Sequence, residues 1–274
     1  MKIFFSSIIC LLCFCFSGCY KAQVSNTEDE VPGKKLNKKL NGCVTASLYG
    51  TSSGSFFNPF RKTFDANGVV NMIVAPEFGL GLSDSLFLNV HYGSNKVYFI
   101  NQSDPTDTVS TAVFNPQGQI QVIYGTEAHS FPTTVFNYTG RKLTSIETFS
   151  ITMDFEYDAN GNVVRYVGSG EGGLDDYEFT YDMTTTIDQQ IYVDQIAGWI
   201  YNNFTLAQIM GWTPDLNPVN KRTHSRIYFD NTEVWYDEDI TGHVVDADGK
   251  LTSYQQGGYQ MQVGWTCRKG NVIN

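Results

Sequence analysis

Apolar and polar residues alternate over several short stretches of this chain, and the alternation predicts β-strands. It is strict over residues 151–157 (ITMDFEY) and returns over residues 177–181 and 259–267. Successive side chains of a strand point to opposite sides of the sheet, so a period of two predicts one buried side and one side in water. The chain is therefore expected to form antiparallel sheet.

A short turn pattern recurs between these stretches. An aromatic or β-branched residue is followed by Asp or Asn, a spacer, a polar residue and Gly, at residues 64–68, 114–118, 136–140, 157–161 and 245–249. Asn-Gly and Asp-Gly supply the positive φ angles that tight hairpin turns require. We therefore predict an all-β fold: a large antiparallel up-and-down meander that forms a curved sheet or a barrel-like domain.

One stretch breaks the alternation. Residues 191–212 (IYVDQIAGWIYNNFTLAQIMGW) have apolar side chains at near-helical spacing, and Thr213-Pro214 then ends the pattern. This predicts an insertion at about residues 187–218, with one or two short helices packed on an end or a face of the sheet. Trp199 and Trp212 lie in this insertion. They are the best candidates for stacking against a ligand, although core packing is the common role of such rings.

The first residues carry the features of an export signal. Lys2 precedes an apolar run over residues 3–16 that is too short to span a bilayer as a stable helix. The next residues complete Phe16-Ser17-Gly18-Cys19, which resembles the lipobox of bacterial lipoproteins. We therefore predict a signal peptide at residues 1–18 and lipidation of Cys19, which would anchor the protein to a membrane.

The rest of the chain divides into a tether and one domain. Residues 19–40 are polar and are predicted to form the lipidated N-terminus and a flexible tether. Residues 41–274 are predicted to form a single β domain. The expected location is the cell envelope, at the outer membrane, on its periplasmic side or at the cell surface.

Besides Cys19, two cysteines remain outside the signal, Cys43 and Cys267. In an oxidising envelope such a pair predicts a disulfide, which would place the first and last strands side by side. The alternation argues against the pair, because Cys267 falls on the apolar side of its strand and Cys43 on the polar side. Two separate thiols are the alternative.

The charge of the chain and its histidines exclude several kinds of partner. The formal net charge is −10, and an acidic chain repels phosphate backbones, so we predict no nucleic-acid binding. The four histidines lie far apart without metal-ligand spacing, and the Asp-rich turns lack the glutamate that completes a calcium loop. We predict neither a metal site nor a cofactor.

Acidic residues gather in two places, and paired carboxylates are the tools of glycoside hydrolysis. The two clusters are Glu171, Asp175, Asp176 and Glu178, and then Asp237, Glu238 and Asp239. Solvated glycine-rich turns would also place carboxylates there, and the motifs of serine hydrolases, nucleotide-binding loops and dinucleotide-binding folds are missing from the sequence. We therefore predict no catalytic residues and no enzyme activity.

The hairpin turns, above all Tyr157-Asp158-Ala159-Asn160-Gly161, and the insertion ending in Gly211-Trp212 resemble a family of Bacteroidota lipoproteins. Its members carry tyrosine-aspartate-like hairpin repeats and have a porin-like fold and an unknown function. The resemblance covers roughly residues 43–267. It implies an architecture and an envelope location, and it supplies no catalytic residues.

Three functions are compatible with these features. The leading hypothesis is a non-enzymatic envelope lipoprotein that binds a glycan or an apolar molecule on its curved sheet. The second is a scaffold whose partner is another envelope protein. The third is a glycan-active hydrolase that uses the acidic loop residues.

Overall fold

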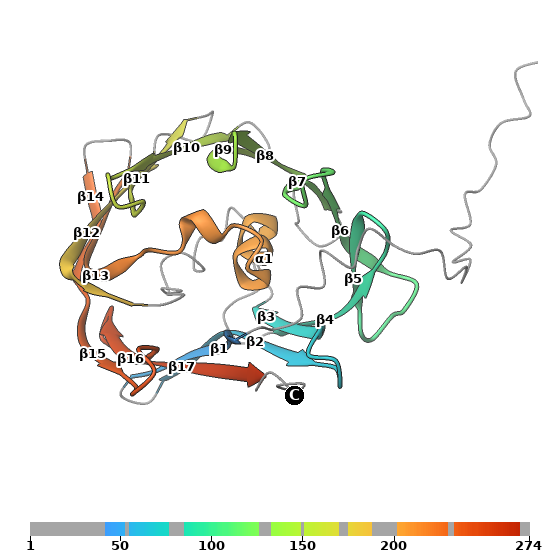
Figure 1. Ribbon diagram of the computed structural model, residues 1–274, viewed down its shortest axis with the longest axis horizontal. Helices are drawn as coiled ribbons and strands as arrows, with labels where there is room; N and C mark the ends of the chain where they lie inside the picture. Colours follow the sequence, from blue (N-terminus) through green and yellow to red (C-terminus); the bar gives the residue numbers. More distant parts are fainter. Residues whose placement is uncertain are drawn as a thin grey trace, which may run out of the picture. The chain divides into compact units, whose positions relative to one another are not determined.

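In the computed structural model, the described part of the chain forms one antiparallel sheet of 17 strands that curls round a helix (Figure 1). The structure describes residues 42–52, 55–76, 85–125, 133–148, 151–169, 175–187, 202–229 and 233–268. The predicted signal peptide, Cys19 and the tether lie outside these residues. None of the helices in the described ranges has the length and apolar character needed to cross a membrane.

The strands follow one another with short connections. They are β1 (Gly42–Ser52), β2 (Ser55–Phe64), β3 (Val70–Pro76), β4 (Ser85–Tyr92), β5 (Lys96–Asn101), β6 (Thr108–Phe114), β7 (Ile120–Gly125), β8 (Thr134–Thr139), β9 (Lys142–Thr148), β10 (Ile151–Tyr157), β11 (Val163–Ser169), β12 (Asp175–Thr186), β13 (Asn220–Phe229), β14 (Glu233–Asp239), β15 (Thr241–Val245), β16 (Leu251–Gln256) and β17 (Tyr259–Arg268). The helix α1 (Asn202–Met210) and the 3-10 turn η4 (Pro214–Leu216) lie between β12 and β13.

The strands form a meander whose last strand pairs with its first, with one interruption in the ladders between β14 and β15. Each strand from β1 to β13 pairs with the next, β15 pairs with β16 and β16 with β17, and β17 pairs back with β1. β14 and β15 are consecutive in the chain, and none of the described ladders joins these two strands. We call their junction at Ile240 the seam. The predicted up-and-down meander is confirmed, as a sheet that does not close.

The predicted turns form for a local reason. In four of the five, the side-chain oxygen of the Asp or Asn accepts hydrogen bonds from the backbone amides two and four residues further on, and the following Gly has a positive φ. These residues are Asp65, Asn115, Asp158 and Asp246. The fifth copy differs: Asn137 lies within β8, and its amide donates to Glu147 on β9.

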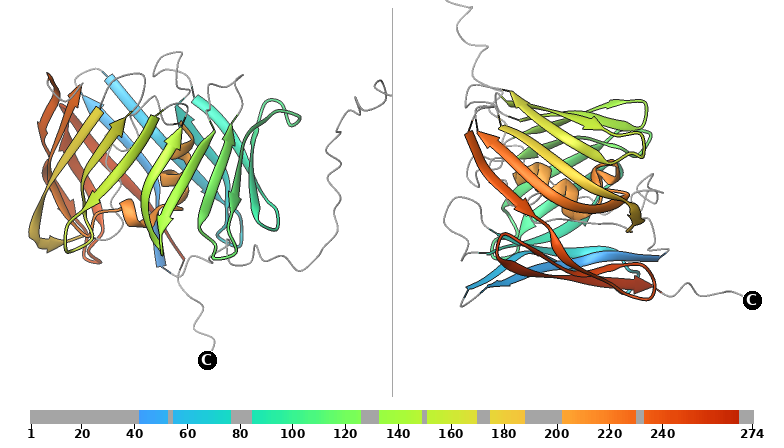
Figure 2. Two further views of the ribbon diagram at one scale, coloured as in Figure 1. Left: turned by 90° about the horizontal axis from the view of Figure 1, so that it is seen from above. Right: turned by 90° about the vertical axis from the view of Figure 1, so that its left-hand side faces the viewer.

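The helix α1 occupies the space enclosed by the strands (Figures 1 and 2). Its residues from Asn203 to Ile209 are all buried, and Phe204 packs against Phe155 of β10. A helix lies within the predicted insertion, and it packs on the concave face of the sheet, which curves round it. Polar contacts hold it there: Ser110 Oγ donates to Asn203 Oδ1 at 2.8 Å, and Lys62 Nζ donates to the carbonyl of Ile209 at 2.7 Å.

The two cysteines meet across the first and last strands. Cys43 is opposite Cys267 in the β1–β17 ladder. A bulge between Thr45 and Ser47 shifts the register, so that Thr45 and Leu48 are both buried although they are three residues apart. Strict alternation placed Cys43 and Cys267 on different sides of their strands, and this expectation was wrong because the bulge shifts the alternation of β1. The structure has Cys267 in a disulfide bond, but the side chain of Cys43 lies outside the described part, so a bridge between the two stays a prediction.

Candidate functional site

A pocket of about 560 Å³ lies beside the seam, between β14 and the hairpin of β16 and β17. We call it the seam pocket. Its lining is polar and includes carboxylates, amides, hydroxyls and one tyrosine ring. The lining residues are Thr51, Asp237, Glu238, Asp239, Thr241, Gln255, Gln256, Gly257, Gly258, Tyr259 and Gln260.

The second predicted acidic cluster provides one wall of this pocket. Asp237 and Asp239 lie opposite Arg226 and His224 of β13, whereas Glu238, between them, lies opposite the buried Ser225. Neighbouring residues of a strand point to opposite sides, so these three carboxylates would ordinarily be separated. They border one pocket because the edge of β14 away from β13 faces the hairpin.

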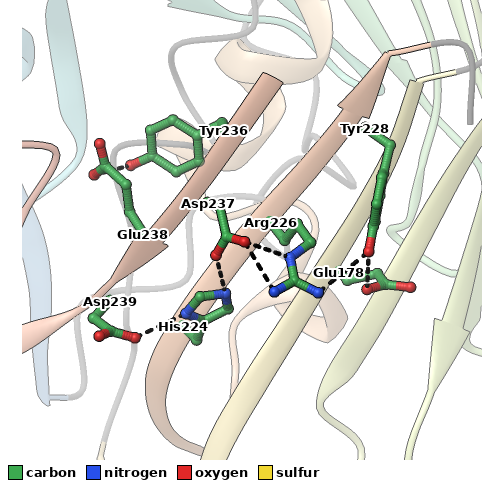
Figure 3. Close-up of polar contacts among 8 residues, drawn as sticks. All are labelled: Glu178, His224, Arg226, Tyr228, Tyr236, Asp237, Glu238 and Asp239. Atoms are coloured by element: carbon green, nitrogen blue, oxygen red, sulfur yellow. Dashed lines mark hydrogen bonds and ion pairs between the residues drawn. The ribbon is translucent and has the colours of Figure 1, made fainter. Parts of the chain in front are cut away.

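A polar network orients two of these carboxylates from the neighbouring strand (Figure 3). Asp237 Oδ2 accepts a hydrogen bond from Arg226 Nε at 2.9 Å, and Asp237 Oδ1 lies 2.8 Å from His224 Nε2. His224 Nδ1 lies 2.9 Å from Asp239 Oδ1. Each carboxylate therefore has a nitrogen partner on β13.

The same network reaches the first acidic cluster. Arg226 donates to the hydroxyl of Tyr228 at 3.3 Å, and this hydroxyl donates to Glu178 Oε2 at 3.3 Å. The hydrogen bonds to Tyr228 and Asp237 raise the pKa of Arg226. The Arg226 guanidinium is therefore held in place on the outward side of β12, β13 and β14.

The other residues of the first acidic cluster lie apart from this network. Asp176 accepts a hydrogen bond from Arg165. Glu171 and the side chain of Asp175 lie outside the described part.

Glu238 has a different environment. Its Oε2 accepts a hydrogen bond from the hydroxyl of Tyr236 at 2.7 Å, and within the described part of the chain it has no cationic partner. A Cβ added at Gly257 would lie 3.0 Å from the same oxygen, and Gly257 has a φ of +61°. Only glycine tolerates both the backbone conformation and the close approach, so Gly257 lets the hairpin reach Glu238.

Gln256 is unusual because its side-chain amide is buried without a hydrogen-bond partner in the described part. Its side chain is 1% exposed, and neither its Oε1 nor its Nε2 has a hydrogen-bond partner among the described residues. A buried amide without partners is costly, since it loses its bonds to water and gains none in return. Both atoms are shielded from solvent, so this amide lies behind the wall of the seam pocket and not on its accessible surface.

Neither Gln256 nor Gly257 was predicted from the sequence as a site residue. The Gly257-Gly258 pair before an alternating strand does mark a hairpin. That this hairpin lies against Glu238 is a tertiary feature, which no local pattern reveals. Groups of three or more metal-binding side chains are absent from the described residues.

Trp212, one of the two predicted stacking residues, does not line the seam pocket. The Trp212 ring packs edge-on against Phe114, with ring centroids 4.9 Å apart, and lies 5.7 Å from Phe99. Trp199 lies outside the described residues. Ligand stacking by these two rings stays a prediction.

Replacing Trp212 tests its place in the core. We expect Trp212→Ala to lower the free energy of unfolding by about 3 kcal/mol, because the contacts with Phe99 and Phe114 are lost and a cavity remains. Urea unfolding gives the value. Tyr124→Ala is the control, since Tyr124 is 54% exposed on β7 and its loss should cost less than about 0.5 kcal/mol. Equal midpoints for the two variants would contradict the core role.

Comparison with known proteins identifies the fold. No protein-family model and no curated protein matches the chain. Among solved structures, the chain is similar to a porin-like protein from Bacteroides uniformis, with 14% sequence identity and a TM-score of 0.56 over 82% of this chain and 98% of that one. It also matches a porin-like protein from Bacteroides vulgatus, with 7% identity and a TM-score of 0.47 over 82% of this chain and 99% of that one.

The first of these likenesses places the chain in a class, that of porin-like folds. It agrees with the porin-like architecture that the family resemblance implied. At this level of identity it shows the fold alone, so lipidation and membership of the repeat family stay predictions.

Proposed function

We propose that this chain is a cell-envelope protein that binds a glycan in the seam pocket and does not act on it as an enzyme. The observation that carries the proposal is the polar lining of the seam pocket, whose carboxylates, hydroxyls and exposed Gln255 amide together supply hydrogen-bond donors and acceptors. A sugar presents hydroxyl groups that both donate and accept, and these match such a lining. Tyr259 adds a ring to the lining, and tyrosine rings combine apolar contact with a polar group.

The polar lining favours a glycan over an apolar ligand. Apolar ligands bind in pockets lined mainly by hydrophobic and aromatic side chains. The seam pocket has one aromatic lining residue and no aliphatic one, and the apolar interior of the sheet contains α1.

Binding without catalysis is supported by the state of the carboxylates. A glycosidase needs one carboxylic acid and one carboxylate free to act on the two sides of the scissile bond. Asp237 and Asp239 are both engaged by β13, through Arg226 and His224. This leaves Glu238 as the one carboxylate of the pocket without such a partner in the described part.

An envelope location is supported by the porin-like fold and by the lipobox resemblance at Cys19. We propose that a lipid on Cys19 holds the protein at the outer membrane. The outward sides of β10 to β14 carry ion pairs, including Arg165 with Glu156 and Arg226 with Asp237. Charged residues on a lipid-facing side destabilise a membrane barrel, so these pairs support a sheet that lies outside the hydrocarbon layer.

A titration of the purified chain with neutral, cationic and anionic oligosaccharides, followed by calorimetry, tests the proposal. We expect saturable binding, and we expect Gln255→Leu to weaken it about tenfold, because the variant keeps the side-chain volume and loses the exposed amide of the lining. Gln117→Leu is the matched control in the exposed β6–β7 turn. Unchanged affinity in Gln255→Leu, or the absence of binding to every oligosaccharide, would reject the seam pocket as a glycan site.

A further inference from the structure

We infer that the outward side of strands β4 to β8 lies on a lipid surface. We call this side the uncharged face. The inference rests on the lipid anchor of the proposed function and does not involve the seam pocket. It is carried by the charges of the strands, by the continuity of the side chains on this face and by the position of Cys19 in the chain.

Charged residues are distributed unevenly over the sheet. In the described strands β4 to β8, Lys96 is the only Lys, Arg, Asp or Glu. On the outward side of β10 to β14, acidic and basic residues alternate from strand to strand. These cross-strand neighbours are Glu156, Arg165, Glu178, Arg226 and Asp237. Removing charges from water is costly, so contact with lipid is unfavourable on β10 to β14, whereas the uncharged face has almost no such cost.

The side chains of the uncharged face form a continuous patch. The positions between them, such as Ala112 and Ile123, are buried, so the patch itself points outward. Two adjacent rows of cross-strand neighbours are Tyr98, Thr111 and Tyr124, and Val113, Val122 and Val135. Tyr124 is 54% exposed and Phe87 of β4 is 41% exposed. Single exposed apolar residues are normal, whereas a contiguous patch marks a contact with a partner or a membrane.

The size of this face favours a lipid surface over a second copy of the chain. The spacing of strands and the rise per residue give five strands of about six residues a plane of roughly 500 Å². A stable protein–protein interface buries about 800 Å² on each partner. A smaller contact suffices at a membrane, because a tether holds an anchored domain at an effective concentration on the order of millimolar.

The chain before β1 supplies this tether. Residues 20–41 separate Cys19 from Gly42, the first residue of β1, and the predicted flexible tether would span roughly 25 Å. A tether of this length leaves the domain free to turn. The chemistry of the surface therefore decides which side of the sheet meets the membrane.

That chemistry suits the boundary between headgroups and acyl chains. Tyrosine is enriched at this boundary, because its ring is apolar and its hydroxyl is polar. Lys96 is exposed at the start of β5, and a lysine there can keep its ammonium group among lipid phosphates while its stem covers apolar surface. The chain as a whole has a formal net charge of −10. Anionic headgroups therefore repel its acidic parts and favour the uncharged face.

The test measures which side of the sheet approaches lipid. The full chain is expressed with its signal peptide, purified from the membrane fraction and reconstituted into vesicles of phosphatidylethanolamine and phosphatidylglycerol. A fluorophore is attached through Tyr124→Cys, and a lipid with a spin label on its headgroup serves as the quencher. The disulfide of Cys267 does not react with the label, and the unsubstituted chain, treated identically, gives the background.

Asp154→Cys is the matched control, because Asp154 is also exposed in the middle of a strand, on β10. We expect quenching at position 124 to be at least about threefold stronger than at position 154, since an apolar face at this boundary lies about 5 to 10 Å deep. Sodium chloride should weaken the preference, because the attraction of Lys96 and the repulsion of the acidic side are both screened.

Equal quenching at the two positions, or stronger quenching at position 154, overturns the contact and leaves the anchor and the seam pocket standing. Self-quenching between copies at position 124 alone, without quenching by the lipid, identifies a second copy on this face and also overturns the inference. A purified chain whose mass shows no lipid on Cys19 contradicts the anchor of the proposed function. The contact is then overturned as well, unless added vesicles still quench position 124 in preference to position 154.

Discussion

Removing the predicted bridge between Cys43 and Cys267 is expected to lower the free energy of unfolding by about 4 to 5 kcal/mol, the value that the chain-entropy treatment gives for a loop of this length. The two residues lie opposite each other where β1 meets β17, and the loop between them includes nearly the whole sheet. Closing such a long loop restricts the unfolded chain strongly. The measurement is urea unfolding of the wild type and of the double variant Cys43→Ser, Cys267→Ser.

The single variants and a reductant complete this experiment. Each single Ser variant should lose as much stability as the double variant, because either change breaks the same bridge. Reductant should lower the midpoint of the wild type and leave that of the double variant unchanged. A wild-type midpoint that does not respond to reductant, with an intact mass that does not change on reduction, would show that the thiols are separate.

The parts of this fold that the sequence predicts are those that a few neighbouring residues determine. The turn at Asp158 needs only the Asp side chain, two backbone amides and Gly161. The same holds at Asp65, Asn115 and Asp246, so the repeated hairpins were predictable. The copy at residues 136–140 kept the spacing but not the hydrogen bonds, because Asn137 bonds across to β9 instead.

The parts that escaped prediction depend on residues distant in the sequence. The bulge near Thr45 reverses the alternation of β1, and no residue type signals it. Strict alternation along β1 therefore assigned Cys43 to the wrong side of the strand. The insertion was recognised as helical, but its place inside the sheet follows from contacts such as that of Asn203 with Ser110. Those contacts form only when strands from both halves of the chain surround α1.

The candidate site shows the same division. Asp237, Glu238 and Asp239 were noticed because three carboxylates in a row are visible in a sequence. What separates Glu238 from its neighbours is the set of partners on β13 and the β16–β17 hairpin, which are both tertiary features. Gln256 has no sequence signal at all, since a glutamine on a strand is ordinary until its burial is known.

The stability of the protein is expected to rise between pH 7 and pH 9.5, with Lys62 as the cause. Lys62 points from β2 into the interior, where Nζ donates to the carbonyl of Ile209 at the end of α1. Burial lowers the pKa of Lys62 to about 7, whereas an unfolded lysine has a pKa of about 10.4. Between these values the unfolded chain binds more protons than the folded protein.

The sign of the effect follows from this difference in bound protons. The free energy of unfolding rises with pH wherever the unfolded state binds more protons, by up to about 1.4 kcal/mol per pH unit for one group. Below pH 7 the lysine is charged in both states, and its contribution no longer changes with pH. Urea unfolding at half-unit steps of pH measures the slope, and an upper limit of pH 9.5 stays below the range in which tyrosines ordinarily ionise.

Lys62→Met should remove this slope, because methionine fills a similar volume and carries no proton. Lys96→Met is the control: Lys96 is exposed on β5, so this variant should keep the wild-type slope. A wild-type stability that stays flat from pH 7 to pH 9.5 would mean that Lys62 retains its proton in the folded protein. The ammonium would then have solvation inside the sheet beyond the Ile209 carbonyl, and the interior round the end of α1 would contain water.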